Sequence, residues 1–185
     1  MFLASLLLDL LKWIFAIMIT YRFYKKKDRE ALIDIINQVA GRERSLQTEK
    51  YVPTPAWEKL LEVGVEKKSG NMLLVVCDEG KLAGFGRLSS EDQGNRAAGN
   101  VGIVLLPGYR SQGIGTKILK FIIGISTKFN YAHLTANILF DNEISLRLFR
   151  GQGFRKSSSR PIFAANRNEF VEEIKMQFSH INAEE

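Results

Sequence analysis

The sequence has little cysteine and little histidine, and both shortages exclude kinds of chemistry. One cysteine, Cys77, is present among 185 residues, so a disulfide within the chain is impossible. Cys77 lies in the apolar run 72–77, which predicts a buried, inert thiol rather than a nucleophile. The two histidines, His133 and His180, have no cysteine partner with which to form a zinc site. We therefore expect neither a disulfide framework nor a bound metal.

A strong excess of either charge is also missing, as are internal repeats and low-complexity segments. The 26 Lys and Arg residues against 20 Asp and Glu residues give a formal net charge of +6. This excess favours an anionic ligand such as a phosphorylated cofactor. It is too small and too dispersed for a nucleic-acid interface, which needs a basic stripe with aromatic residues between the charges. The length fits one domain with one sizeable core.

Residues 1–18 are apolar except at three positions. They lack the positive n-region and the cleavage site of a secretory signal, and their length is marginal for a membrane span. Three interpretations stay open: a reading frame that truly starts at Met18, a helix docked on the domain or a membrane surface, and a span with the rest of the chain in the cytoplasm. We expect a cytoplasmic protein, which is membrane-associated if residues 1–18 contact the bilayer.

The most informative stretch is 101–120, which reads as a strand, a glycine-rich turn and a helix. It begins with a continuous apolar run, as in a strand buried on both faces, and apolar residues recur at helical spacing from Thr116 onward. Gly113 and Gly115 lie where free backbone N–H groups and the positive end of the helix dipole favour a phosphate group. Arg110 adds positive charge. The turn predicts a pyrophosphate site, with a plain turn of small, tightly packed residues as the alternative.

Two common phosphate motifs do not match this turn. A Walker A loop needs Gly-Lys-Ser/Thr, whereas the order here is Gly115-Thr116-Lys117. The dinucleotide fingerprint needs Gly or Ala at position 118, which is Ile118. The turn is therefore of a different kind from both.

The remaining sequence alternates strand-like and helix-like patterns, which places the fold in the α/β class. We expect strands over 19–24, 72–77, 82–88, 101–106, 131–139, 160–164 and 170–178, and helices after Asp28, around 57–61 and over 141–150. Residues 89–100 read as a polar loop. The domain would span 19–180, with 1–18 as a separate segment and 181–185 as a tail.

Two motifs resemble those of the GCN5-related N-acetyltransferases (GNAT). Residues 110–115, Arg-Ser-Gln-Gly-Ile-Gly, resemble that family's Gln/Arg-x-x-Gly-x-Gly/Ala signature. Residues 141–149, followed by Gly153 and Phe154, resemble its Asn-x-x-(Ala/Ser)-x-x-Leu-Tyr/Phe segment with the later Gly-Phe. The order of elements over 19–178 is also that of the family.

The resemblance implies a GNAT fold and an acetyl-CoA-dependent N-acetyltransferase without a metal. In this fold helices flank a mixed, mostly antiparallel central sheet, and strands 101–106 and 133–139 splay apart to admit the pantetheine arm of coenzyme A. Leu105 and Leu106 would offer backbone groups to that arm, and the N–H of Val104 or Leu105 would stabilise the oxyanion. The implied cofactor-binding residues are Val104, Leu105, Leu106, Arg110, Ser111, Gln112, Gly113, Ile114, Gly115, Thr116, Asn142 and Phe149.

Two positions depart from the family pattern. Phe149 stands where relatives carry a proton-donating tyrosine, and Asn137 stands where peptide-acetylating relatives carry a glutamate base. Asn142 would cap its helix, lie near the cofactor arm, or do both. The catalytic residues stay unknown, and His133 reads as a structural imidazole. The candidate bases are Glu143, Glu172 and Tyr51, followed by Glu49 and Glu169, each of which can equally be a solvated surface group.

The resemblance also implies an acceptor site, which in relatives is lined by the region that here holds Arg42, Glu43, Arg44, Tyr51 and Trp57. That segment mixes charged and aromatic residues, which suits an amino sugar, a small or polyamine-like amine, or a peptide terminus. The implied substrate-binding residues are Arg44, Tyr51, Trp57 and Asn137. Two other functions stay open, a non-catalytic acyl-CoA sensor, motivated by Phe149 and Asn137, and a membrane-tethered scaffold. A homodimer is open as well.

Overall fold

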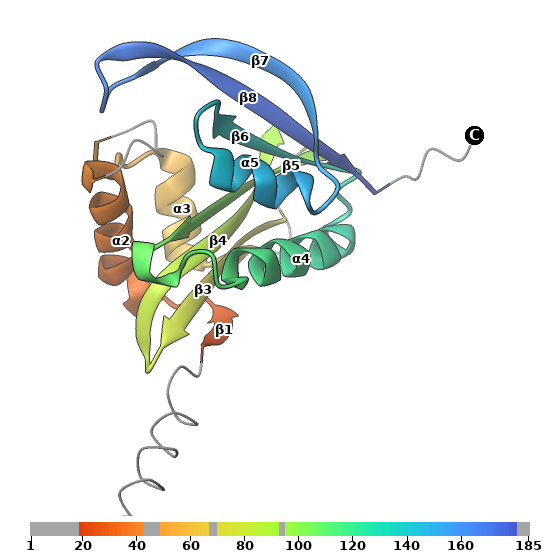
Figure 1. Cartoon of the computed structure of the whole chain (residues 1–185). Helices are drawn as coiled ribbons and strands as arrows, with labels where there is room; N and C mark the ends of the chain where they lie inside the picture. Colours follow the sequence, from red (N-terminus) through yellow and green to blue (C-terminus); the bar gives the residue numbers. More distant parts are fainter. Residues whose placement is uncertain (1–18, 43–48, 67–69, 93–94, 181–185) are drawn as a thin grey trace, which may run out of the picture.

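The computed structural model describes residues 19–42, 49–66, 70–92 and 95–180. The strands are β1 (Thr20–Phe23), β2 (Val65–Glu66), β3 (Asn71–Asp78), β4 (Lys81–Asp92), β5 (Asn95–Leu105), β6 (His133–Leu139), β7 (Arg155–Ala164) and β8 (Glu169–Ser179). They form one sheet in the order β1-β3-β4-β5-β6-β8-β7, with β2 paired to β3 (Figure 1). All pairs are antiparallel except β5 with β6. The expected mixed, mostly antiparallel sheet is confirmed.

Helices cover both faces of this sheet. The α-helices are α2 (Arg29–Arg42), α3 (Pro55–Val63), α4 (Ile114–Ser126) and α5 (Glu143–Arg150), and short 3₁₀ turns lie at Lys26–Asp28, Pro107–Tyr109 and Thr127–Phe129. Apolar residues of α4 and α5 pack into one core cluster, and those of α2 and α3 pack into a second.

Strand β3 contributes side chains to both clusters. Met72, Leu74 and Val76 belong to the cluster with α4 and α5, whereas Leu73, Val75 and Cys77 belong to the cluster with α2 and α3. A strand with helices on both faces needs apolar residues at every position, which explains the unbroken apolar run. The expected burial of the Cys77 thiol is confirmed.

The parallel pair β5–β6 is short, and this opens the sheet. The two strands pair at three positions, from Ala98 opposite His133 to Asn100 opposite Thr135. Beyond these positions β5 continues to Leu105 and β6 to Leu139 without pairing to each other. The strands therefore separate toward the end that carries the glycine-rich turn, as the resemblance implied.

The expectation of a polar loop over 89–100 was wrong, because every described residue of this range lies in strand β4 or strand β5. Polar groups there find partners across the sheet. The backbone N–H of Ser90 donates to Oδ1 of Asn71 at 2.9 Å, and the Asn100 side chain contacts both Arg87 and Thr135. Cross-strand hydrogen bonds thus satisfy polar residues that a hydrophobicity pattern assigns to a loop.

Strand β7 also begins earlier than expected, at Arg155 rather than near residue 160. It lies at the edge of the sheet, and its residues are exposed from Arg155 to Pro161. Because the exposed part of this edge strand buries no face, its sequence has no pattern of apolar residues that would predict a strand. Only its last part, which ends at the buried Ala164, carries the apolar signal.

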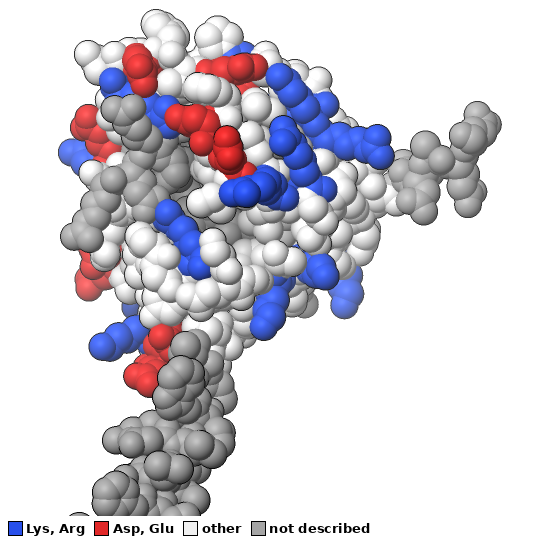
Figure 2. Space-filling model, viewed as in Figure 1, with Lys and Arg blue, Asp and Glu red and all other residues white. Residues whose placement is uncertain are grey.

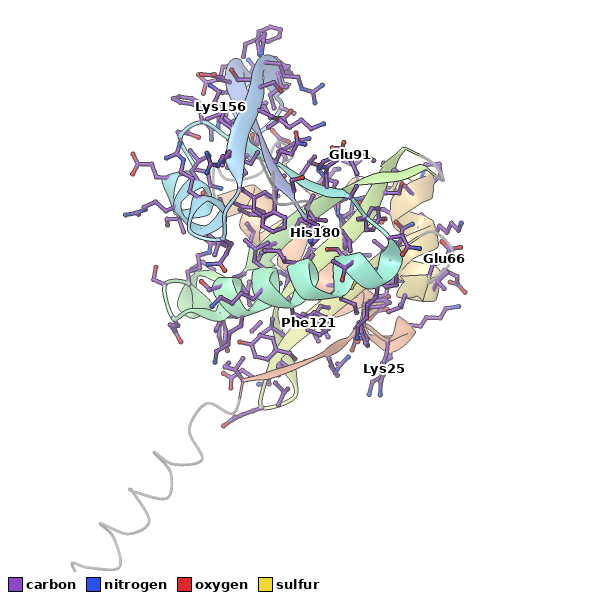
Figure 3. All side chains as sticks on the ribbon, turned by 90° about the vertical axis from the view of Figure 1, so that its right-hand side faces the viewer. Lys25, Glu66, Glu91, Phe121, Lys156 and His180 are labelled. Atoms are coloured by element: carbon purple, nitrogen blue, oxygen red, sulfur yellow. The ribbon has the colours of Figure 1, made fainter. Side chains whose placement is uncertain are left out.

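Both histidines connect elements of the fold. Nε2 of His180 lies 2.8 Å from Oγ of Ser126 on α4, and Figure 3 shows His180 beside that helix. Burial lowers the pKa of His180, which favours the neutral imidazole. Nδ1 of His133 lies 3.0 Å from Oγ of Ser179 on the neighbouring strand. Both contacts fit structural roles.

The first and last residues of the chain, 1–18 and 181–185, lie outside the described residues, so the open interpretations of these two segments stay as they were. Among the residues that are described, no helix has the length and apolarity to cross a bilayer.

Candidate active site

Two hollows lie at the gap between β5 and β6. The first, here called the loop hollow, has a volume of about 360 Å³ and is bounded by the turn before α4 and by α5. The second, here called the aromatic hollow, has a volume of about 480 Å³ and is bounded by Tyr51, Trp57 and Phe85 together with β4, β5 and β6. Ile103, Val104, Asn142, Ser145 and Phe149 line both hollows. The two hollows therefore meet where the strands separate.

The turn before α4 has the backbone of an anion cradle. Ser111 and Gly113 have positive φ angles of 58° and 78°, and Gly113 is the N-cap residue of α4 without a side-chain cap. The N–H of Lys117 donates to the carbonyl of Gly113 at 3.1 Å, so the preceding N–H groups of the first turn have no intrahelical acceptor. The lining of the loop hollow includes Gly113, Gly115 and Thr116. Such N–H groups suit a diphosphate.

The two glycines of the turn have different reasons to be glycine. A Cβ on Gly113 would meet no atom within 4 Å, so its positive φ is what favours glycine. A Cβ on Gly115 would lie 3.1 Å from Cδ2 of Leu148, so glycine there allows α4 to pack closely on α5. The two interpretations of the turn, anion site and tight packing, therefore both apply, at different positions.

The Arg110 side chain connects the turn to the end of β5 through hydrogen bonds. Its Nε and Nη2 donate to the carbonyl oxygen of Leu105 at 2.9 and 2.7 Å. The guanidinium also lines the loop hollow, as expected for a group that supplies charge. From residue 93 to residue 140 the sequence has no Asp or Glu and has five Lys and Arg residues. Figure 2 shows Lys and Arg side chains over α4, whereas Lys or Arg and Asp or Glu side chains lie together beside α5, so the excess of positive charge lies on the side of α4 and favours an anion there.

Three residues expected at the turn lie outside the lining of the loop hollow. Ile114 is buried in the core, and the Gln112 side chain is exposed and donates to the carbonyl of Gly108 at 2.6 Å. Their backbone N–H groups can still face an anion. The N–H of Leu106, in contrast, donates to the carbonyl of Ala83 at 3.0 Å. The carbonyl oxygen of Leu106 accepts from the N–H of Tyr109 at 3.0 Å, so both backbone groups of Leu106, which we expected to face pantetheine, already have partners in the fold.

Strand pairing decides which β5 backbone groups face the gap. In an antiparallel pair, successive residues direct their N–H and C=O groups alternately toward and away from the partner. Because Leu106 bonds to β4, Val104 points the same way, and Ile103 and Leu105 point into the gap. Leu105 thus stays a candidate oxyanion donor and Val104 does not. The sequence did not indicate Ile103 as a cofactor-binding residue, because the direction of its backbone groups depends on the register between β5 and β4.

Asn142 caps α5 and lies where the hollows meet. Its Oδ1 accepts a hydrogen bond from the N–H of Ser145 at 3.1 Å. Phe149 is one turn after Ser145 on the same helix face, and its buried ring stands 5.0 Å from that of Phe154. The predicted cap is confirmed, and position 149 lies at the junction, as the motif implied. Among the described residues, Ser145 has the only side-chain hydroxyl that lines both hollows, and sequence reasoning did not single it out.

The aromatic hollow brings together three of the four predicted acceptor residues. Tyr51, Trp57 and Asn137 line it, whereas Arg44 lies outside the described residues. The Trp57 ring packs edge to face with Tyr51 and Phe85, at centroid distances of 6.1 and 6.2 Å. The lining also includes Arg87, which sequence reasoning missed, although a cation within the apolar strand 82–88 was a usable signal.

The candidate bases do not fit that role. Glu143 is exposed at the start of α5. Hydrogen bonds from Ser159 and from Lys156, which lies 3.3 Å away, lower the pKa of Glu172. Neither lines a hollow, and no Asp or Glu lines either hollow in the described part of the chain. Tyr51 does line one, but burial and a hydrogen bond to Glu58 raise its pKa to about 12, so it stays protonated. The weaker candidates Glu49 and Glu169 are exposed.

Comparison with known proteins identifies a family model and solved structures that are similar to this chain. A family model described as the acetyltransferase (GNAT) family matches residues 33–154. No curated protein matches the chain in sequence. Many solved structures share the fold. One is a GNAT acetyltransferase from Streptococcus pneumoniae, with a TM-score of 0.75, 19% identity, and coverage of 87% of this chain and 98% of that one.

Two further structures carry more specific descriptions. The ribosomal-protein-alanine N-acetyltransferase from Brucella melitensis has a TM-score of 0.74 and 22% identity, over 86% of this chain and 99% of that chain. A phosphinothricin acetyltransferase from Sinorhizobium meliloti in complex with acetyl-CoA has a TM-score of 0.74 and 21% identity, over 87% and 88%. At sequence identities of 19–22%, the similarity to these three structures shows a shared fold and does not show a shared substrate.

Proposed function

Because this chain belongs to the GNAT acetyltransferase family, we propose that it is an N-acetyltransferase, which moves the acetyl group of acetyl-CoA to a primary amine of a small molecule or a peptide. The observation that carries the proposal is the meeting of the two hollows where β5 and β6 separate. A donor in one hollow and an acceptor in the other would place their reacting groups at one junction.

The loop hollow fits coenzyme A. The N–H groups from Gln112 to Thr116 would hold its diphosphate, and the surrounding cations would add electrostatic attraction. Its pantetheine arm would run along β5 past the backbone groups of Leu105 and Ile103, which face the gap. The acetyl thioester supplied by this donor would then lie between Ile103, Asn142 and Phe149, which line both hollows.

The residues at the junction have separate tasks in the transfer. The neutral amine attacks the thioester carbonyl, a C–N bond forms, the C–S bond breaks to release the thiolate, and the nitrogen loses one proton, so that the products are an amide and, once the thiolate takes up a proton, a thiol. The N–H of Ile103, which lines both hollows, or that of Leu105 next to it on the same strand edge would stabilise the negative charge that develops on the carbonyl oxygen. An alkylamine is mostly protonated near neutral pH, so it must first lose a proton. Since no carboxylate lines either hollow in the described residues, we assign this proton to water rather than to a side-chain base.

A thiol-release assay tests the proposal. The protein is incubated with acetyl-CoA and a panel of primary amines, and free thiol is followed against a control without amine. We expect amine-dependent release with at least one class of amine and a mass increase of one acetyl group on that amine. Tight binding of acetyl-CoA without release on any amine would overturn the proposal in favour of an acyl-CoA sensor.

A further inference from the structure

Arg87 is a cation inside the aromatic hollow. It lies on β4, its Cζ stands 5.2 Å from the centroid of the Trp57 ring, and its side chain is partly buried. Nη2 donates to Oδ1 of Asn100 at 2.7 Å, the one hydrogen bond of this guanidinium among the described residues. An arginine has five N–H donors in a planar fork, so most of its donors stay available.

This guanidinium has no acidic partner in the described part of the chain. A chain of hydrogen bonds leads from Asn100 to Thr135 at 3.3 Å and from Thr135 to Glu91 at 2.6 Å. Glu91, which Figure 3 labels, also accepts from Lys175 at 3.1 Å. Two neutral side chains therefore separate Arg87 from this carboxylate, which has its own cation.

Burial without a counter-charge is costly for a cation. Loss of hydration lowers the pKa of Arg87, and no acidic group among the described residues offsets this effect. Buried charges in proteins are normally paired. Because the described residues offer no such partner and the hollow is open to ligands, we take the partner to be a ligand.

The backbone of β5 leaves room for that ligand. Gly102 pairs with Arg87, and a Cβ on Gly102 would lie 3.7 Å from Nε and 3.8 Å from Nη2 of Arg87. Because Gly102 has no side chain, the guanidinium of Arg87 is accessible from the aromatic hollow. Asn100 holds the guanidinium from one side, and Trp57 supports it through its ring face.

We propose that Arg87 binds a carboxylate of the acceptor, so that the substrate is a small amine that also carries a carboxylate group. The inference rests on the proposed function and adds the acceptor class. Arg87 is the only charged residue in the lining of the aromatic hollow among the described residues, and one guanidinium matches the single charge of a carboxylate. A dianionic phosphate would leave one negative charge uncompensated, and the described lining offers a polyamine no carboxylate for its second ammonium group.

Matched pairs of acceptors test the inference. Each common amino acid is compared with its primary amide, which keeps the amine and loses the charge. With the unaltered protein we expect kcat/KM for the favoured acid to exceed that for its amide by roughly tenfold to a hundredfold, mainly through KM. Arg87→Gln should remove this preference, with a much larger loss of kcat/KM for the acid than for its amide, and Arg87→Lys should retain part of it. The matched control is Arg150→Gln, which alters an exposed cation of α5 that lines neither hollow.

Binding without turnover separates this inference from the proposed function. Calorimetry on the protein loaded with coenzyme A compares an N-acetylated amino acid with its amide. We expect tighter binding of the acid, lost in Arg87→Gln, while the affinity of that variant for coenzyme A stays within about twofold as evidence of folding. Equal binding of acid and amide, an equal loss for both in Arg87→Gln, or a preference for phosphorylated amines would overturn the inference. Absence of thiol release with a retained acid preference would reject the transferase function alone.

Discussion

The hydroxyl of Tyr51 donates a 2.8 Å hydrogen bond to Oε1 of Glu58. Both carboxylate oxygens of Glu58 also accept from Nη2 of Arg29, at 3.0 and 2.7 Å. The phenol is thus fixed as a donor at the edge of the aromatic hollow. Its raised pKa of about 12 keeps it there in the protonated form.

We predict that Tyr51→Phe retains activity and loses a pH-dependent part of stability. A phenol with a pKa near 12 cannot act as a base at neutral pH, so kcat should change less than about threefold. Because the folded pKa lies above the ordinary value of 10.0, the hydroxyl stabilises the fold fully below pH 10, and this contribution disappears as pH rises toward 12.

Denaturant unfolding at several pH values measures this effect. The gap in stability between the unaltered protein and Tyr51→Phe should be constant from pH 7 to 9 and shrink above pH 10. Tyr24→Phe measures the share due to burial alone, because burial also raises the pKa of Tyr24 while its hydroxyl has no hydrogen-bond partner in the described structure. A loss of activity in Tyr51→Phe of a hundredfold or more would instead give the phenol a direct role.

Gly113→Val should weaken acetyl-CoA binding. A β-branched residue at a φ of 78° costs about 1–2 kcal/mol or more, so the turn would shift away from the cradle shape. We expect the Kd for acetyl-CoA, measured by calorimetry, to rise roughly tenfold or more. Gly124→Val, at an exposed position of the same helix with open space around it, should leave the Kd unchanged. Unchanged affinity in Gly113→Val would show that the diphosphate binds elsewhere.

Phe149→Tyr tests whether the departing thiolate needs an acid. The new hydroxyl would stand at the junction of the two hollows. Because a thiol pKa is already near ambient pH, we expect kcat to rise by less than about threefold. Phe163→Tyr, at an exposed ring on β7, controls for the substitution itself. A tenfold rise at position 149 alone would mean that protonation of the thiolate limits turnover.

Asp28 and Arg22 should control stability in acid. The carboxylate is buried, with a side-chain exposure of 6%, and accepts from Nη1 and Nη2 of Arg22 at 2.6 and 2.9 Å and from the N–H of Lys25 at 2.8 Å. Arg22 holds the pKa of Asp28 below its ordinary value. The pair therefore stabilises the fold above that value, and the contribution is lost as pH falls through the lower folded pKa.

Asp28→Asn should lower the free energy of unfolding at pH 7 by about 2 kcal/mol, with a smaller effect near pH 3. Chemical denaturation at the two pH values measures the difference. Glu172→Gln removes an exposed ion pair and should have little effect at either pH. An equal effect of Asp28→Asn at both pH values would show that the loss is one of packing rather than of charge.

Sequence patterns predicted the elements that bury apolar residues. The run 72–77, the stripe on α4 and the turn at Gly113 all have periodic or special residues, and the structure has them as expected. The end of the β4–β5 hairpin was missed, because hydrogen bonds such as that between Ser90 and Asn71 replace an apolar pattern there. The periodicity of apolar residues predicts which elements are buried, whereas the sequence does not indicate which polar residues become hydrogen-bond partners when strands pair.

The sequence predicted the parts of the candidate site whose backbone geometry follows from a local motif. It did not predict the parts whose orientation depends on the register between strands. The turn around Gly113 and the cap at Asn142 follow from local spacing. Which of Ile103 and Leu106 faces the gap depends on pairing with β4, which spacing along β5 cannot give. Glu172 failed as a candidate base for a related reason, since its side chain is engaged by Lys156 on the next strand.

The three-position pairing of β5 with β6 leaves two internal strand edges within one sheet. Backbone amides on such edges exchange with solvent deuterium readily until an extended chain covers them. Ile103 and Leu105 should therefore exchange quickly in the free protein and become protected when a ligand fills the gap. A ligand that bridges both edges also joins the β1–β5 and β6–β8 parts of the sheet, so its binding should make them unfold as one unit.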